Sequence, residues 1–189
     1  MNNLELIAIT RNDRYLRNVT VKLHENPIEC DCNVYSLLRY LQQDMNPNAL
    51  NYVDIEIGDL ECYGPDYMDG IKIEDINVTD HKCKINFDDD STNDACSMEG
   101  ICTCWKRPRD NSLIIDCSGR NLTEVPEFIN PRGANCVELD LSDNELSIAP
   151  SLNEKGYEDI CQLNLAGNKI SDLKIDNVAS TKLKVKFYF

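Results

Sequence analysis

The sequence lacks the features that enzymes and membrane-spanning proteins usually show. No segment approaches the roughly 18 consecutive apolar residues that a membrane-spanning helix needs. The chain has two histidines, His24 and His81, and neither lies beside a nucleophile motif. There is no G-x-S-x-G sequence and no phosphate-binding loop. We therefore expect a protein that is not an enzyme, takes no cofactor and has no small-molecule substrate.

Positive charge is also scarce. The 189 residues include 19 Lys+Arg against 33 Asp+Glu, which gives a formal net charge of -14. Nucleic acids are bound by basic surfaces, so nucleic acid is not an expected partner. An anionic membrane surface is disfavoured by the same repulsion. A basic patch on another protein is compatible with this charge.

A secretory signal is not visible either. Met1-Asn-Asn lacks basic residues, and the apolar run Leu4–Ile9 is too short for the core of a signal peptide. Cysteine, by contrast, is abundant. The ten cysteines are clustered, which is typical of disulfide-bonded proteins in an oxidising compartment. Together these features indicate a fragment of an extracellular protein, or an incomplete gene model, rather than a cytosolic protein with reduced thiols.

Three glycosylation motifs agree with an extracellular protein. They are Asn18-Val-Thr, Asn77-Val-Thr and Asn121-Leu-Thr. One such match means little, but three beside clustered cysteines carry more weight. Because a glycan cannot be buried, we expect all three asparagines to be exposed and glycosylated.

Two segments fit the leucine-rich repeat template L-x-x-L-x-L-x-x-N-x-L. Residues 136–146 fit it with Cys136 at the first position, and residues 160–170 fit it completely. Their asparagines, Asn144 and Asn168, are 24 residues apart. The alternating leucines predict a short strand with one buried face, and the asparagine is expected to bond backbone groups of the loop. Two units in register make ordinary amphipathic strands a poor alternative.

Weaker repeat signals lie near both ends. Residues 4–12 fit the template as far as Asn12, and a further strand, Val19–Leu23, leads to Asn26. These asparagines are only 14 residues apart, which predicts a cut or irregular end of an array. Alternating residues in Leu183–Phe189 predict the strand of a third repeat after the two central ones.

The first cysteine cluster has the spacing C-x-C, 29 residues, C, 20 residues, C. It consists of Cys30, Cys32, Cys62 and Cys83. Apolar residues at positions 34, 37, 38 and 41 predict an amphipathic helix capped by Asp31 or Asn33. Residues 26–32, Asn-Pro-Ile-Glu-Cys-Asp-Cys, resemble the C-terminal flanking cap of leucine-rich repeats, which covers the apolar end of a solenoid. The spacing alone leaves three pairings open. The resemblance implies Cys30–Cys62 and Cys32–Cys83.

The second cluster consists of Cys96, Cys102, Cys104 and Cys117. It is followed by Asn121-Leu-Thr-Glu-Val-Pro. This segment, with its expected strand Leu113–Cys117, resembles the N-terminal flanking cap of leucine-rich repeats. The resemblance implies the pairs Cys96–Cys104 and Cys102–Cys117. Leu122 and Val125 would start the apolar face of the next solenoid.

Zinc is the competing explanation of clustered cysteines. Zinc sites usually contain C-x-x-C pairs, whereas both tight pairs here are C-x-C and the histidines do not lie at ligand spacing. A C-x-x-C redox motif is absent as well. We expect no metal. Cys136 and Cys161 lie one repeat apart, so stacked coils could bring them within disulfide distance, with two buried free thiols as the alternative.

Two further segments have simple interpretations. Asp88–Asp94 is expected to be a flexible acidic linker, since it lacks the glycine and the terminal glutamate of a calcium loop. The turn-rich segment Tyr63–Gly70 is expected to be a loop inside the first cap. Contact with a partner is one role for this loop, and an ordinary surface loop is the alternative.

The order of the caps is the most specific feature. A C-terminal cap followed at once by an N-terminal cap resembles the juxtamembrane ectodomain region of insect-type Toll receptors, and residues 150–168 also look Toll-like. The expected fold is an α/β class of leucine-rich-repeat solenoid fragments with two disulfide-rich caps. We expect the end of a first array in 1–29, a C-terminal cap in 30–87, an acidic linker in 88–95, an N-terminal cap in 96–128 and a truncated second array in 129–189.

The resemblance also implies a function. It implies the extracellular part of a transmembrane receptor in innate immune or developmental signalling, on the outer side of the plasma membrane. The implied partners are a Spätzle-type cystine-knot cytokine, bound through the full receptor, and a second receptor chain. The alternative is a secreted or matrix leucine-rich-repeat protein for adhesion or binding.

Overall fold

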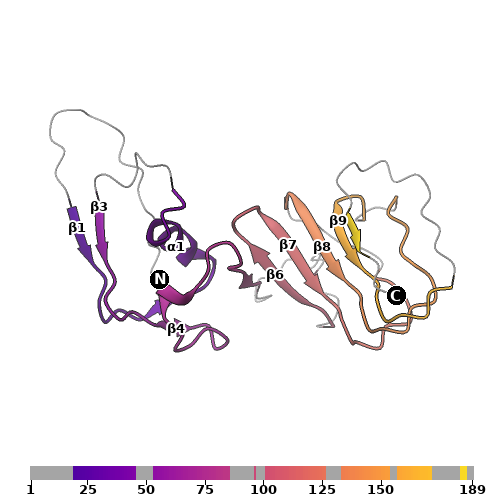
Figure 1. Ribbon diagram of the computed structural model, residues 1–189. Coiled ribbons are helices and arrows are strands. Elements are labelled where there is room, and N and C mark those ends of the chain that lie inside the picture. The colour runs from indigo at the N-terminus through magenta and orange to yellow at the C-terminus, as the bar shows by residue number, and fades with distance from the viewer. Residues whose placement is uncertain are drawn as a thin grey trace. The chain divides into compact units, whose positions relative to one another are not determined.

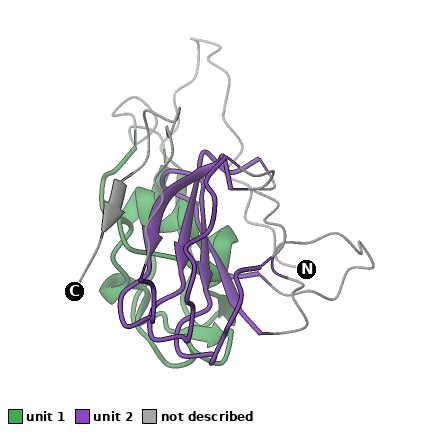
Figure 2. Cartoon of the chain, turned by 90° about the vertical axis from the view of Figure 1, so that its right-hand side faces the viewer, with its two compact units in different colours: residues 1–83 green, residues 84–189 purple. Residues whose placement is uncertain are grey.

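The computed structural model describes residues 19–45, 53–85, 96, 101–126, 133–153, 157–171 and 184–186. The chain forms two compact units, Met1–Cys83 and Lys84–Phe189, which are described separately (Figures 1 and 2). Taken together they make a mixed α/β structure dominated by strands, as the sequence predicts, and the helical elements of the described residues all lie in the first unit. The repeat segment 4–12, Asn18 and the acidic linker 88–95 lie outside the described residues.

The first unit contains two short parallel strand pairs. Strand β1 (Val19–Lys22) pairs with β3 (Val53–Glu56), and β2 (Ile28–Glu29) pairs with β4 (Cys62–Gly64). The β1–β3 pairing is not evident from the sequence, because β3 lies inside the segment assigned to the first cap. The predicted strand Val19–Leu23 is confirmed, one residue shorter.

A helix follows the C-x-C sequence, as the apolar spacing predicts. A 3-10 turn, η1 (Cys32–Val34), leads into α1 (Tyr35–Leu41), so the α-helix starts two residues after Asn33. Asp31 caps the 3-10 turn, since its Oδ1 accepts a hydrogen bond from the backbone N–H of Asn33 at 2.8 Å, whereas the N-cap residue of α1 itself, Val34, makes no side-chain capping bond. The buried side chains of the helix pack into the core of this unit, whose members include Val34, Leu37, Leu38, Leu60, Ile73 and Val78.

Packing and hydrogen bonds hold the end of the first unit against this helix. The 3-10 turn η2 (Ile73–Asp75) buries Ile73 and contacts α1. The side-chain amide of Gln42 donates to the carbonyl oxygen of Ile76 and accepts from the backbone N–H of Val78 at 3.0 Å. The segment after β4 is thereby fixed against the helix.

The second unit contains β6 (Thr103–Arg107), β7 (Ser112–Asp116), β8 (Cys136–Asp140), β9 (Ile160–Asn164) and β10 (Lys184–Lys186). The strand order is β10-β9-β8-β7-β6-β5, with β5 at Cys83–Lys84. Strands β6 and β7 form an antiparallel hairpin, and the pairings from β7 to β10 are parallel. The predicted strand of a third repeat is confirmed for residues 184–186.

Alternation along the strands places one set of side chains in the core. In β8 the buried side chains alternate, at Val137 and Leu139. In β9 they are Ile160 and Leu163, three positions apart, because the β8–β9 pairing contains a register shift. Leu122 and Val125, at the exit from the second cap, pack against this core as expected. Across the ranges that the structure describes, no helix has the length and apolar character needed to cross a bilayer.

Candidate functional site

The first cap is closed by two disulfides. Cys30 follows β2 and Cys62 begins β4, and the parallel pairing of these strands brings them together with a Cα–Cα distance of 5.5 Å. Cys32 forms a disulfide with Cys83, and their Cα atoms are 5.3 Å apart. These are the two pairs that the resemblance to a C-terminal flanking cap implies. The bonds hold the start of the helix to two segments that follow it in the chain.

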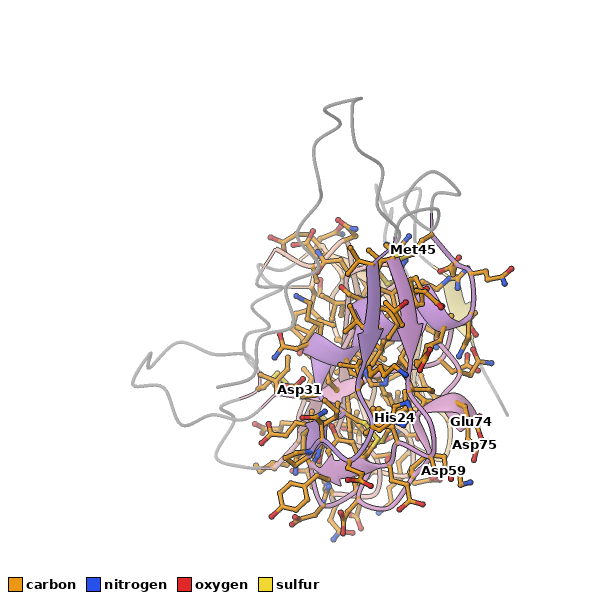
Figure 3. All side chains as sticks on the ribbon, turned by 90° about the vertical axis from the view of Figure 1, so that its left-hand side faces the viewer. His24, Asp31, Met45, Asp59, Glu74 and Asp75 are labelled. Atoms are coloured by element: carbon orange, nitrogen blue, oxygen red, sulfur yellow. A yellow bond between two sulfur atoms is a disulfide. The ribbon has the colours of Figure 1, made fainter. Side chains whose placement is uncertain are left out.

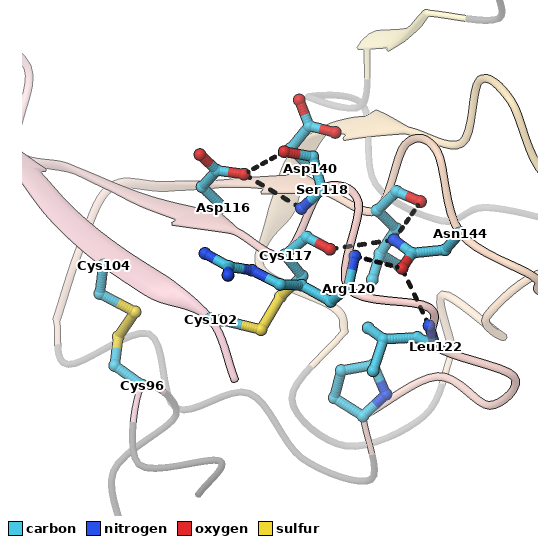
Figure 4. Close-up of a disulfide and its surroundings, with 12 residues drawn as sticks. Cys96, Cys102, Cys104, Asp116, Cys117, Ser118, Arg120, Leu122, Asp140 and Asn144 are labelled. Carbon is cyan, nitrogen blue, oxygen red and sulfur yellow. Dashed lines mark hydrogen bonds between the residues drawn. A yellow bond between two sulfur atoms is a disulfide. The ribbon is translucent and has the colours of Figure 1, made fainter. Parts of the chain in front are cut away.

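The second cap is closed in the same way (Figure 4). Cys96 is bonded to Cys104 with a Cα–Cα distance of 5.8 Å, and Cys102 to Cys117 with one of 4.5 Å. Cys102 precedes β6 and Cys117 follows β7, so the antiparallel hairpin accounts for the second pair. Both are again the pairs implied by the resemblance.

The fifth disulfide joins two repeats. Cys136 and Cys161 lie on the neighbouring parallel strands β8 and β9, with Cα atoms 5.4 Å apart. All ten cysteines lie in the described ranges, and none is free. Among the described residues, no group of three His, Cys, Asp or Glu side chains is placed to hold a metal ion. The five disulfides constrain the two caps and the first two repeats.

Asn144 is the hydrogen-bonding centre of the second unit. Its Nδ2 donates to the carbonyl oxygens of Cys117 at 2.9 Å, and of Leu141 and Ser142 at 3.0 Å each. Its Oδ1 accepts from the backbone N–H groups of Arg120 and Leu122, both at 3.0 Å. The side chain is 5% exposed, so these bonds satisfy backbone groups that water reaches poorly. Asn144 thus fastens the first repeat to the cap before it (Figure 4).

Asn168 repeats these contacts one unit later. Its Nδ2 donates to the carbonyl oxygens of Leu141, Leu165 and Ala166, and its Oδ1 accepts from the backbone N–H of Leu146. Each of these partners lies 24 positions after the corresponding partner of Asn144. Asn144 itself lies 24 positions after Arg120, from whose backbone N–H it accepts a hydrogen bond. Asn26 in the first unit makes the local part of the pattern, to the carbonyl oxygens of Leu23 and His24. The fourth predicted repeat asparagine, Asn12, lies outside the described residues.

The repeat geometry begins inside the second cap, which sequence reasoning missed. Strand β7 pairs with β8 in register from Ser112↔Cys136 to Asp116↔Asp140, so Cys117 stands where Leu141 stands in the first repeat. The asparagine position of this coil is occupied by Arg120. The template could not identify this coil because its leucine and asparagine are replaced.

A second row of hydrogen-bonding side chains lies at equivalent positions of successive coils. Asp116 Oδ1 accepts from the backbone N–H of Ser118 at 3.1 Å, and Asp140 Oδ1 accepts from that of Ser142 at 2.9 Å. Each serine hydroxyl also donates to the same oxygen. Asn164 continues the row by donating from Nδ2 to Asp140 Oδ2 at 3.1 Å. The signal in the sequence is an Asp or Asn residue at the same position of each coil.

An ion pair joins the β6–β7 hairpin of the second cap to strand β8 of the first repeat. The Arg107 guanidinium lies 2.8 Å from Asp110 Oδ2 and also pairs with Glu138. Hydrogen bonds to Asp110 and then to Glu138 raise the pKa of Arg107 above its ordinary value. Burial raises the pKa of Asp110, but hydrogen bonds from Arg107 and Ser112 outweigh it and leave the pKa lowered. Arg107 therefore stays charged between its two partners.

Comparison with known proteins identifies the region. No protein-family model matches the chain. Drosophila melanogaster Protein toll is 30% identical over 161 residues, which is 85% of this chain and 14% of that protein. The chain is homologous to a region of the insect Toll ectodomain.

Two further comparisons agree with a leucine-rich-repeat fold, and one of them is again with Toll. A chain of the Drosophila Toll–Spätzle complex superposes with a TM-score of 0.72 at 26% identity, covering 90% of this chain and 23% of that one. Mouse leucine-rich repeat-containing protein 17 is 27% identical over 76% of this chain and 31% of its own length. The chain thus spans less than a third of the length of each of these relatives.

Two of the three glycosylation motifs of the chain lie in the described residues. The side chains of Asn77 and Asn121 are exposed. Asn77 Oδ1 accepts hydrogen bonds of 2.8 Å from both the backbone N–H and the hydroxyl of Thr79. Asn121 has a φ of 57°, a conformation that asparagine tolerates better than most residues. Neither side chain occupies a solenoid core.

His81 is a buried, hydrogen-bonded histidine of the first cap. The residue is 4% exposed, and its Nε2 lies 3.0 Å from the backbone carbonyl oxygen of Asp31. Because a carbonyl can only accept, the neutral ring carries its proton on Nε2 and donates it. Burial lowers the pKa of His81, against the smaller opposing effects of this hydrogen bond and of the Asp31 carboxylate. His81 therefore fixes the segment before Cys83 to the C-x-C sequence.

Proposed function

We propose that this chain is part of the extracellular region of a Toll-type transmembrane receptor that signals in innate immunity or development. The observation that carries the proposal is the succession of two different disulfide-closed caps on a chain homologous to a region of Toll. In this proposal the chain lies on the outer side of the plasma membrane, in the juxtamembrane part of the ectodomain. The segment boundaries expected from the sequence are part of the proposal.

The role proposed for the region is that of a rigid stalk. A specific interface needs about 800 Å² on each partner. The parallel face of the second array is built from short strands of three to five residues, β8, β9 and β10, which is little concave surface for a ligand. Five disulfides and the repeated backbone hydrogen bonds of Asn144 and Asn168 favour a supporting element instead. The stalk would position the ligand-binding first array and bring two receptors together after ligand has bound.

The proposed ligand of the full receptor is a Spätzle-type cystine-knot cytokine. Support comes from the structural similarity to a chain of the Toll–Spätzle complex. The net charge of -14 agrees with a protein partner and with no nucleic acid. No enzymatic activity is proposed, since the relatives are named as Toll and as a leucine-rich-repeat protein.

Deletion of residues 96–189 from the full receptor tests the stalk role. Ligand affinity should survive the deletion, measured on the secreted ectodomain, while cytokine-induced signalling in cells should change. The matched measurement uses the isolated, oxidised chain, which should not bind the cytokine with submicromolar affinity. Loss of affinity in the deleted receptor, or tight binding by the isolated chain, would place the second array in the ligand site and refute the stalk role.

A secreted or matrix leucine-rich-repeat protein is the second candidate. The similarity to mouse leucine-rich repeat-containing protein 17 over 76% of this chain supports it. Sequencing of the transcript beyond Phe189 separates the two proposals. A membrane helix followed by a cytoplasmic TIR domain supports the receptor, and a stop codon after a second C-terminal cap supports the secreted protein.

A further inference from the structure

One loop of the first unit carries an unusual share of exposed apolar surface. Six large apolar residues of the described chain are exposed, and three of them lie within nine positions: Tyr63, Tyr67 and Ile71. Their exposed fractions are 71%, 40% and 38%. Scattered single apolar residues are ordinary on a protein surface, but a cluster marks an interaction site. We call residues 61–72 the tyrosine loop.

Backbone pairing closes the base of the tyrosine loop. Glu61 and Lys72 form an antiparallel bridge. The N–H of Cys62 donates to the carbonyl oxygen of Ile71 at 2.8 Å, and that of Gly70 donates to the carbonyl oxygen of Cys62 at 2.9 Å. Gly70 has a φ of +74°, which favours glycine. The disulfide from Cys62 to Cys30 anchors the same base to the cap core.

The interior of the loop is ordered as well. The N–H of Met68 donates to the carbonyl oxygen of Pro65 at 2.7 Å, and the N–H of Ile71 donates to that of Met68 at 3.1 Å. Strand alternation explains the outward tyrosine, since Cys62 is buried in its disulfide and Tyr63, the next residue, faces away. A loop fixed in this way loses little conformational entropy when a partner binds.

The surroundings of the tyrosine loop are strongly acidic. Residues 53–80 contain nine Asp or Glu residues and one basic residue, Lys72. Asp66 and Asp69 lie within the loop itself, and both are exposed. Lys72 lies 3.8 Å from Asp59, so it neutralises part of one carboxylate only. Asp59, Glu74 and Asp75 are labelled in Figure 3, and all three are exposed.

We propose that the tyrosine loop is a docking surface for an arginine-rich segment of another protein. Exposed tyrosine faces bind guanidinium groups by stacking and cation–π attraction, and the flanking carboxylates accept their hydrogen bonds. The matching loop of a second copy is the wrong occupant, because two acidic loops repel each other; association of two receptors through other surfaces is unaffected by this. The proposal is independent of the stalk role, since it concerns a surface of the first cap in whichever protein contains it.

Binding of octa-arginine to the oxidised full chain tests the proposal. Octa-citrulline, which keeps the planar side chain without the charge, and octa-lysine are the comparison probes. Octa-arginine should bind at least about tenfold more tightly than octa-citrulline and several-fold more tightly than octa-lysine. The largest amide chemical-shift changes should fall on Tyr63, Asp66, Tyr67 and Gly70.

Matched variants separate this loop from general charge attraction. The double substitution Tyr63→Ser with Tyr67→Ser should weaken octa-arginine binding about tenfold. Ile148→Ser, which removes a 75% exposed apolar side chain elsewhere, should leave it unchanged. Asp66→Asn with Asp69→Asn should weaken binding more than Asp54→Asn with Asp80→Asn, which removes two exposed carboxylates of the same unit outside the loop.

Three outcomes would overturn the proposal. The first is equal binding of octa-arginine by the wild-type chain and the double tyrosine variant. The second is an equal loss from the two aspartate pairs, which would mean charge attraction without a site. The third is shift changes spread over the acidic surface of the second unit. A thermal unfolding scan of each variant verifies that these exposed substitutions leave the fold intact.

Discussion

Asn144 donates a hydrogen bond from its side-chain nitrogen to the carbonyl oxygen of Cys117, 2.9 Å away and 27 positions earlier in the chain. Cys117 is a half-cystine of the second cap, and Asn144 is the asparagine of the repeat template in the coil that follows. The bond joins a residue recognised as part of a disulfide cap to one recognised as part of a repeat. Cap and repeat therefore share one hydrogen-bond network.

Substitution of Asn144 should destabilise the second unit strongly. Asn144→Ala leaves the backbone N–H groups of Arg120 and Leu122 and the carbonyl oxygen of Cys117 without this partner. We expect a loss of about 2–4 kcal/mol in the free energy of unfolding, measured by guanidinium denaturation. Asn168→Ala should cost less, since Asn168 is only half-buried. Equal effects of the two substitutions would contradict the special position of Asn144.

The disulfide pairing should be the same in secreted material. Peptide mapping without reduction should yield Cys30–Cys62, Cys32–Cys83, Cys96–Cys104, Cys102–Cys117 and Cys136–Cys161. Paired replacement of Cys102 and Cys117 by serine should cost roughly 2–5 kcal/mol of stability, because it frees the ends of the β6–β7 hairpin. Free thiol at Cys30 or Cys104 in native protein would refute the cap pairings.

Glycans should be attached at Asn77 and Asn121, which are exposed, and at Asn18. Protein secreted from insect cells should lose mass in three steps under partial deglycosylation. Each of Asn18→Gln, Asn77→Gln and Asn121→Gln should remove one step and leave the other two. A wild-type chain with fewer than three steps, assigned by glycopeptide mass spectrometry, would identify the motif that is not used.

The first cap should weaken on mild acidification. Burial lowers the pKa of His81 below its ordinary value of 6.5, so between these two values the unfolded chain binds a proton that the folded chain does not. The stabilising contribution is therefore complete above about pH 6.5 and is lost as the pH falls toward the lowered pKa. Hydrogen exchange at α1, measured against pH, should show the loss.

The two histidines supply a matched pair for this experiment. His81→Gln should abolish the pH dependence near neutrality, while His24→Gln should retain it, because the side chain of His24 is 50% exposed. The glutamine at position 81 keeps a side-chain N–H donor for the carbonyl of Asp31 but has no titratable group. A pH dependence that survives His81→Gln would assign it to other groups.

Local patterns in the sequence predict the features that depend on neighbours in the chain. The helix after Cys32 follows from apolar spacing, and the strands of residues 136–170 follow from the leucine template. The sequence could not decide between Asp31 and Asn33 as the capping residue, since both residue types cap helices well, and the structure has Asp31 capping the 3-10 turn. The choice is made by the turn that the C-x-C sequence adopts.

Noncovalent contacts between distant segments could not be predicted. The contact between His81 and Asp31 spans 50 positions, and the pairing of Arg107 with Glu138 spans 31. The coil around Cys117 escaped recognition because a half-cystine replaces its leucine and Arg120 replaces its asparagine. For Arg107 and for this coil the physical cause is a register between strands, which a one-dimensional template does not contain.

The 24-position step between Arg120 and Asn144 bears on how the length of such an array can change. Asn168 takes over from Asn144 the same kinds of backbone partner, each moved by one repeat. A whole unit could therefore be inserted or removed between β8 and β9 without requiring any residue to find a new type of partner. An insertion inside the strand or before the asparagine of a unit would put a leucine or the asparagine out of phase, whereas the loop before the strand can vary, since leucine-rich units range over about 20–29 residues. Changes in the number of repeats should thus occur in whole units, with the caps unaltered.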